Sequence, residues 1–302
     1  MMGHVPSTGE SAAAKVSDIN SARPAGRRLW TNRLASAAMV GAVLLAVIPV
    51  GLILYYITVK GMAAMSWEFL SEPTPFSFRR AEGGFLNGLI GTGIMVGLAT
   101  LVSVPLGILA AIYLQEFGRG LLANLIRFFS DVMTGVPSVF VGLFVYTAFV
   151  LPFGFGAVMG AAALAIIMLP IVVRTTEEML KLVPLELQHG SFALGASKFQ
   201  TIIRVVLPSA LPGITTGVLL AVARAAGETA PLILTALGSL KVTTTLVGEP
   251  ISALPLLIFD GARNPFAAGQ ERAWAGALEL LALVLIFTLL ARIVASRSKI
   301  SS

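Results

Sequence analysis

The chain has 302 residues, of which 56% are hydrophobic and only 12% are charged, and its mean hydropathy is +0.89. This composition is typical of polytopic membrane proteins. The sequence contains no cysteine and only two histidines, which excludes a disulfide framework, thiol catalysis and a cysteine metal cluster. Nothing near His189 completes a set of metal ligands, so we predict no metal site. The formal charge is +6, but the basic residues gather at the ends of apolar runs, where they set orientation, so we predict no nucleic-acid partner.

Six apolar segments are predicted to cross the membrane as helices, since about 20 residues span the ~30 Å of hydrocarbon. Residues 1–33 contain few large apolar side chains and are expected to form a disordered cytoplasmic tail. The first span covers residues 34–59, and an extracytoplasmic loop follows over residues 60–84. A core domain over residues 85–294 should hold the other five helices, before a short cytoplasmic tail over residues 295–302.

The core domain divides at its polar and turn-forming residues. In chain order we expect span two (85–114), a short polar connection (115–131), spans three and four as a hairpin (132–173) with a turn at 151–154, span five (205–240) and span six (274–291). Residues 251–259 are apolar but too short and proline-interrupted to cross, so we expect them at the external interface or in a re-entrant position.

Basic residues are distributed unequally between the two sides of this arrangement. With the N-terminus inside, fourteen Lys and Arg residues fall in the inner segments and six in the outer segments. Because cytoplasmic loops are enriched in Lys and Arg, both termini and the loop after span four are predicted to lie in the cytoplasm.

The loop between spans four and five, residues 174–213, carries its own helical pattern. Pro184 should start a helix and Gly195 should end or bend it, while Leu187, Phe192 and Phe199 recur at near-helical spacing. Two interpretations remain open, a helix lying on the membrane surface or a helix that docks a cytoplasmic partner.

The same loop resembles the EAA loop of ABC importer permeases. A seven-residue block ends in Gly195, nine residues follow, and then comes Val-Val-Leu-Pro, ending in Leu207 and Pro208. In that family the loop fits a groove on a cytoplasmic ATPase, so the resemblance implies a coupling loop over residues 174–209. Gly195 matches the family's glycine, and the loop is expected to stop at Leu207 and Pro208.

One part of the coupling loop departs from the family pattern. Where the family usually reads Glu-Ala-Ala, this chain has His189, Gly190 and Ser191. The usual acidic contact with the ATPase is therefore missing, and Glu186 or Glu178 is expected to supply the charge.

Two further segments, residues 134–144 and 224–231, resemble the phosphate-specific permeases of the PstA and PstC type, and chain length favours the PstA type. The resemblance implies an all-α integral membrane protein of six helices with type I ABC importer permease architecture, which passes inorganic phosphate across the bacterial cytoplasmic membrane. It also implies a PstC-like second permease in a heterodimer, a PstB-like ATPase dimer and a PstS-like extracytoplasmic phosphate-binding protein.

The sequence has no G-x-x-x-x-G-K-[ST] motif, so we expect this chain to be no enzyme and to bind no cofactor, with ATP and Mg used by the partner ATPase. Charge alone leaves sulfate or molybdate open as substrates. A self-contained secondary anion transporter should show paired broken helices in two halves, and we find no convincing internal repeat.

Arg224 and Glu228 are charged residues inside the predicted span five, where a charge near the bilayer centre costs ~2.5–3.5 kcal/mol on the insertion scale. Their i, i+4 spacing allows a pair that simply neutralises itself. In the functional interpretation, Arg224 attracts an oxyanion through two hydrogen bonds and Glu228 keeps the anion from being held too tightly.

Further candidates have more than one interpretation. Arg174 is either a membrane anchor or a pathway charge, and Ser138 donates its hydroxyl to the anion or to a freed carbonyl. Thr229, beside Glu228, is assigned to the pathway with it. Asp131 is expected to cap span three, and Glu279 to be protonated or to face a neighbouring subunit.

Overall fold

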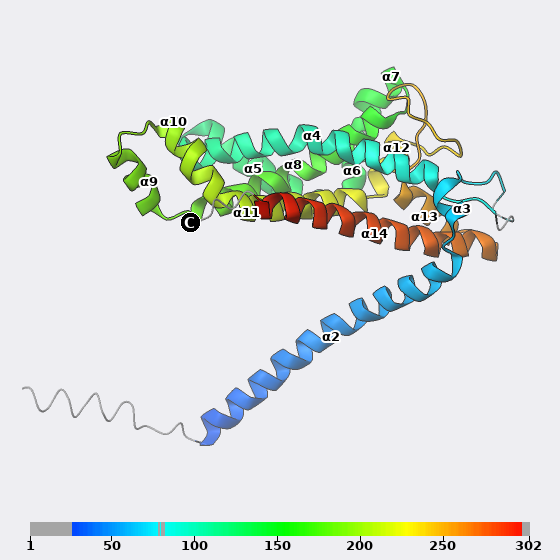
Figure 1. Ribbon diagram of the computed structural model, residues 1–302, viewed down its shortest axis with the longest axis horizontal. Helices are drawn as coiled ribbons and strands as arrows, with labels where there is room; N and C mark the ends of the chain where they lie inside the picture. The colour runs from blue at the N-terminus through cyan, green and yellow to red at the C-terminus, as the bar shows by residue number, and fades with distance from the viewer. Residues whose placement is uncertain (1–25, 78, 80–81, 298–302) are drawn as a thin grey trace, which may run out of the picture. The chain divides into compact units, whose positions relative to one another are not determined.

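The computed structural model describes residues 26–77, 79 and 82–297, and its helices are drawn in Figure 1. The chain forms two units, Met1–Tyr55 and Tyr56–Ser302. Helix α2 (Gly26–Ala64) begins in the first unit and contains the predicted span one. The predicted disordered tail lies mostly outside the described residues, but residues 26–33 are helical, so the prediction of disorder is wrong there. Side chains 29–55 are all exposed in the single chain, as expected where lipid or another subunit covers a helix.

The second unit is an assembly of helices. In chain order these are α3 (Trp67–Ser71), α4 (Leu86–Glu116), α5 (Leu121–Gly135), α6 (Ser138–Val145), the π-helical turn η1 (Tyr146–Val150), α7 (Leu151–Phe153), α8 (Ala157–Lys181), α9 (Leu185–Ala193), α10 (Lys198–Thr201), the π-helical turn η2 (Ile202–Val206), α11 (Leu207–Ala226), α12 (Ala230–Thr235), α13 (Leu254–Ala262) and α14 (Ala267–Arg297).

Five helices of the described chain are long and apolar enough to span a membrane, and a sixth span is obtained when α5 and the helix over Ser138–Phe153 are counted as one bent pair. The predicted all-α fold with six spans is confirmed on that count. The spans outside this pair are Leu29–Ala64, Leu86–Glu116, Ala157–Lys181, Lys198–Ala226 and Ala267–Leu289.

The third span is broken, and here the prediction of a polar connection over 115–131 is wrong, because α5 already begins at Leu121. The two halves meet at an angle of 109°. The break lies at Val136, which is extended (φ −74°, ψ 127°) because the ring of Pro137 disfavours helical geometry in the preceding residue. The turn predicted at 151–154 is present, since α7 ends at Phe153 and Gly154 has a φ of +83°.

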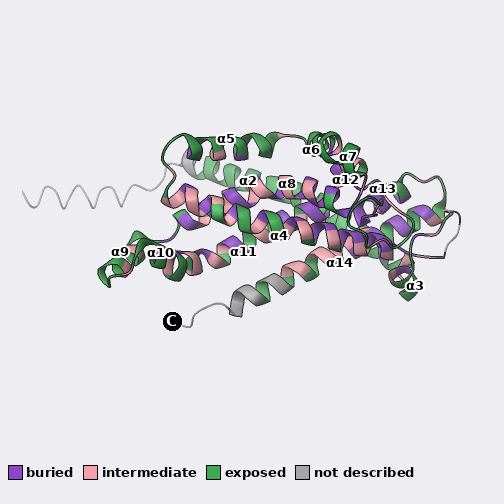
Figure 2. Cartoon of the chain, turned by 90° about the horizontal axis from the view of Figure 1, so that it is seen from above, coloured by how far each residue is buried: buried purple, intermediate pink, exposed green. Residues whose placement is uncertain are grey.

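Helix α8 is the centre of the second unit, and Figure 2 shows buried residues along α8 and α4. The main core cluster joins these two helices to α11, α12 and α13, with Leu164, Met168 and Met95 fully buried. Close approach depends on glycine at some positions: a Cβ on Gly91 of α4 would lie 1.9 Å from the carbonyl oxygen of Ser252. The core therefore fixes α8 between the two broken segments that bear the predicted pathway residues.

The short apolar segment after α12 is buried. Residues 251–257 are all buried, and the backbone N–H of Leu254 at the start of α13 donates to Thr92 Oγ1 at 2.8 Å. This placement favours the re-entrant alternative over the interfacial one.

The bounds of the last two spans also differ from prediction. Span five starts at Lys198 and ends at Ala226, well before residue 240, and span six is longer than predicted because α14 runs from Ala267 to Arg297.

Candidate functional site

Arg224 and Glu228 lie at the break between α11 and α12. Arg224 is in the last turn of α11, the helix ends at Ala226, and Glu228 follows the capping Gly227. Arg224 Nε and Glu228 Oε1 are 3.4 Å apart, with side chains that are 51% and 16% exposed. The ion pair expected from the i, i+4 spacing is therefore formed, although Glu228 lies outside the helix.

A small cavity brings two of the predicted pathway residues together. Arg224 of α11 and Ser138 of α6 both line it, with Pro170 of α8 and Thr134 of α5. Ser138 is the first residue of α6, so the N-terminus of that helix lies at the cavity. The volume of about 20 Å³ has room for about one water molecule. The space between these four helices is therefore too small for a tetrahedral oxyanion in this conformation.

A second ion pair lies on the same seam between α5 and α8. Arg174 and Asp131 approach to 2.9 Å, with side chains 42% and 53% exposed. Asp131 is inside α5, so its predicted role as a helix cap is wrong. Asp131 precedes Thr134 by three residues and Arg174 follows Pro170 by four, so this pair lies one helical turn from the cavity.

Thr229 is half-buried at the position before α12, and it is not among the residues that line the cavity. Its carbonyl accepts the N–H groups of Leu232 and Ile233 at 3.1 and 3.2 Å. The structure therefore brings Arg224 and Ser138 to one cavity and pairs Glu228 with Arg224, but neither Glu228 nor Thr229 lines that cavity.

The predicted helix in the coupling loop is present as α9, which starts directly after Pro184. Gly195 has a φ of +83°, and its N–H donates to Phe192 O at 2.9 Å, so glycine supplies the left-handed residue that ends the helix. Glu186, His189 and Gly190 are exposed on this helix.

The coupling loop is tied to the helix that follows it. Ser191 and Thr201 share a hydrogen bond of 2.8 Å between their hydroxyls, which joins α9 to α10. The predicted stop at Leu207 and Pro208 is wrong, because these residues open α11 after the π-helical turn η2. Pro208 lacks the N–H that would bond the carbonyl of Arg204, and the widened turn accommodates this gap.

Sequence reasoning missed a buried carboxylate near the end of α8. Glu177 has a side chain only 1% exposed, and its Oε1 lies 3.1 Å from Arg127 of α5 and 2.9 Å from Lys181. The i, i+4 spacing of Glu177 and Lys181 was the one available signal. Glu279 of α14 is also buried, and both of its carboxylate oxygens lack a hydrogen-bond partner among the described residues.

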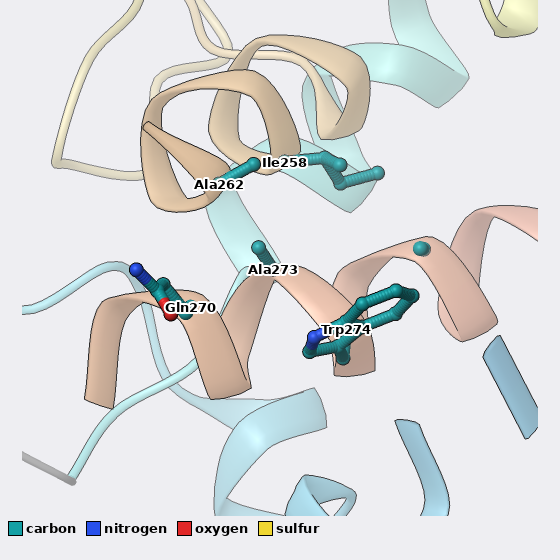
Figure 3. Close-up of a pocket in the computed structure, with 6 residues that line it drawn as sticks. Ile258, Ala262, Gln270, Ala273 and Trp274 are labelled. Carbon is teal, nitrogen blue, oxygen red and sulfur yellow. The ribbon is translucent and has the colours of Figure 1, made fainter. Parts of the chain in front are cut away.

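A larger pocket of about 310 Å³ between α13 and α14 is not part of this site (Figure 3). It is lined mainly by apolar side chains, with Gln270 and Trp274 as the polar ones, and none of the predicted pathway residues reaches it. Within the described residues, no group of three or more His, Cys, Asp or Glu side chains is placed to hold a metal ion.

Comparison with known proteins identifies the family. Residues 103–300 match the family described as binding-protein-dependent transport system inner membrane component. The chain is 42% identical over 274 residues to the phosphate transport system permease protein PstA of Yersinia pestis, covering 90% of this chain and 92% of that protein. It is 38% identical over 283 residues to PstA 1 of Mycobacterium tuberculosis (strain CDC 1551 / Oshkosh), covering 90% and 92%.

A chain of the MetNI methionine ABC transporter in an inward-facing conformation is similar with a TM-score of 0.49 and 19% identity, over 70% of this chain and 91% of that one. The family match and the two relatives each cover most of the described helices. The chain therefore belongs to the binding-protein-dependent transport system inner membrane components and, within them, to the PstA permeases, as a multi-pass inner-membrane permease subunit of an ABC transporter.

Proposed function

We propose that this chain lets inorganic phosphate cross the bacterial cytoplasmic membrane as one permease subunit of an ATP-driven importer. Its relatives in Yersinia pestis and Haemophilus influenzae are named phosphate transport system permeases, at 42% identity. The observation that carries the proposal is the cavity where Arg224 and Ser138 meet, because both belong to breaks in membrane-spanning helices. Broken helices leave backbone groups and a helix N-terminus available to a polar solute inside the membrane.

Arg224 is the residue that would attract the anion. Its guanidinium is always charged, and its planar fork can donate two hydrogen bonds to phosphate oxygens. Glu228 competes for the same group from 3.4 Å, which would limit how tightly the anion is held. The hydroxyl of Ser138 and the N-terminus of α6 would add donors on the other side of the cavity, with Thr229 at the pathway's outer margin.

The pathway must open for transport, because the present cavity of about 20 Å³ does not admit phosphate. Opening along the α5–α8 seam would lead the anion past Arg174, one turn further along α8. Asp131 would then restrain Arg174 as Glu228 restrains Arg224, so the anion would meet two cations in sequence, each with a competing carboxylate.

The exposed parts of the chain support the partner subunits that we propose. Half of the Arg224 side chain is exposed in the single chain, which supports a second, PstC-like permease on the other side of the pathway. A PstB-like ATPase dimer would bind the coupling loop and use ATP and Mg, while this chain binds no cofactor. A PstS-like phosphate-binding protein would deliver the anion outside, and both termini would lie in the cytoplasm. The coupling residues are Glu186, His189, Gly190, Ser191, Gly195, Leu207 and Pro208.

Uptake of labelled phosphate tests this proposal in cells that carry the chain with its partner subunits. Arg224→Gln should remove uptake without lowering the amount of assembled complex, because only the charge is lost. Arg292→Gln, which removes an exposed charge of α14, is the matched control and should retain uptake. Normal uptake by Arg224→Gln would overturn the site, and uptake blocked by excess sulfate would overturn phosphate as the preferred substrate.

A further inference from the structure

A polar pocket of about 540 Å³ lies at the end of α4, and none of the proposed pathway residues lines it. It is lined by residues 114–119, which end α4 and follow it, together with Arg127 of α5 and Lys198 of α10. Its volume is within the range of about 300–1,000 Å³ that is typical of small-ligand sites. Since the apolar span ends at Glu116, the pocket lies at the edge of the membrane.

Two of the basic side chains in this pocket are held in fixed positions. Arg127 donates to Leu114 O at 3.0 Å and to Gly118 O at 3.4 Å, while it also contacts Glu177. Lys198 donates to Glu116 O at 2.7 Å, and its ammonium group lies 4.2 Å from the centre of the Phe117 ring. The pocket therefore has two cations that are placed before any ligand arrives.

The third basic residue has free hydrogen-bonding capacity. Arg119 is exposed, and its guanidinium forms no hydrogen bond or ion pair with the described residues. The nearby carboxylates are Glu116, 3.5 Å from Lys198, and Glu177, which is shared by Arg127 and Lys181. Three cations (Arg119, Arg127 and Lys198) and one carboxylate (Glu116) line the pocket, which therefore keeps a net positive charge that favours an anion.

An apolar groove of about 640 Å³ lies beside this pocket along α4, α5 and α8. Ala110 lines the groove and Leu114 lines the pocket, one helical turn apart on α4, and Ile126 and Arg127 are consecutive on α5. The groove is lined by aliphatic and aromatic side chains, with Ser130 as its one hydroxyl. A positive pocket at the membrane edge next to an apolar groove matches a molecule with an anionic head and a hydrocarbon tail.

We infer that this pocket binds the phosphate headgroup of an anionic phospholipid, with an acyl chain in the adjacent groove. Arg119 is the side chain that closes on the headgroup, while Arg127 and Lys198 supply the fixed positive charge. This inference rests on the proposed function at one point: the orientation of the importer places the pocket on the cytoplasmic side of the membrane.

The test uses the complete transporter, reconstituted in vesicles of phosphatidylcholine with or without phosphatidylglycerol and examined by native mass spectrometry. The wild-type complex should retain phosphatidylglycerol in preference to phosphatidylcholine. Arg119→Gln should retain about five-fold less, which is what one basic residue near an anionic headgroup contributes. Arg292→Gln removes the same charge elsewhere on the chain and should retain the wild-type amount.

Each alternative result has a distinct meaning. Equal retention by Arg119→Gln and the wild type, or equal retention of the two lipids, would overturn the site. Binding of labelled inorganic phosphate that Arg119→Gln removes, without any change in lipid retention, would overturn the lipid as the ligand. Phosphate uptake is measured in the same vesicles, so a failure of the proposed function would appear there and not in the lipid retention.

Discussion

Arg224 and Glu228 form an ion pair across the end of α11, with 3.4 Å between Nε and Oε1, although the helix stops at Ala226 between them. The pair thus joins a membrane-spanning helix to the segment that leads into α12. Any movement of α12 relative to α11 would change the distance between the two charges, and with it the number of hydrogen bonds that Arg224 can offer to an anion.

Glu228→Gln should change the kinetics of phosphate uptake in a specific way. Without the competing carboxylate, Arg224 should hold the anion more tightly and release it more slowly, since a pathway must bind weakly enough to let go. We expect a several-fold lower maximal rate together with a lower phosphate concentration at half-maximal uptake. Glu249→Gln, at an exposed carboxylate beyond α12, is the control. A higher half-saturating concentration in Glu228→Gln would contradict this role.

The Asp131 and Arg174 pair can be tested by a double-mutant cycle in the uptake assay. Residues that act as one pair are non-additive, with interaction energies of about 0.5–3 kcal/mol. Asp131→Asn and Arg174→Gln should each reduce uptake, and the double variant should be no worse than the more affected single variant. Multiplicative losses would show that the 2.9 Å contact has no part in transport.

Gly195→Val should uncouple ATP hydrolysis from phosphate transport in the reconstituted complex. The φ of +83° at Gly195 is strained for a β-branched residue, at a cost of about 1–2 kcal/mol, so the end of α9 should shift. Gly93→Ala, inside α4, is the matched control: a Cβ there meets nothing within 4 Å, and alanine favours the helix by up to about 1 kcal/mol. Coupling should be lost in the first variant and kept in the second, and the same coupling ratio in both would count against the docking role of α9.

Glu177→Gln should lower the thermal midpoint of the purified permease. The change leaves Arg127 and Lys181 without their shared carboxylate, at a cost of about 1–3 kcal/mol, because both cations still reach solvent. Glu178→Gln removes the neighbouring exposed carboxylate and should leave the midpoint unchanged. Equal midpoints for the two variants would show that the buried cluster contributes nothing to stability.

Local chemistry predicted several features of the structure from residues that are close in sequence. Pro184 and Gly195 set the two ends of α9, and Gly154 lies in the turn predicted over residues 151–154. The contact between Arg224 and Glu228 also follows from their spacing. Each of these depends on the backbone preferences of one or two residues, or on a separation of four, so no distant part of the chain is needed.

The amino-acid sequence is enough to show that this protein crosses the membrane several times, because long uncharged runs have no other stable environment. It also determined which ABC permease motifs the chain carries, and where α9 begins and ends. Three contacts become visible only in the packed helices: Ser138 and Arg224 share a cavity, Asp131 pairs with Arg174, and Arg127 and Lys198 meet at the end of α4. These contacts join residues that are far apart in the chain, and they depend on how α4, α5 and α11 pack around α8, which no local periodicity specifies.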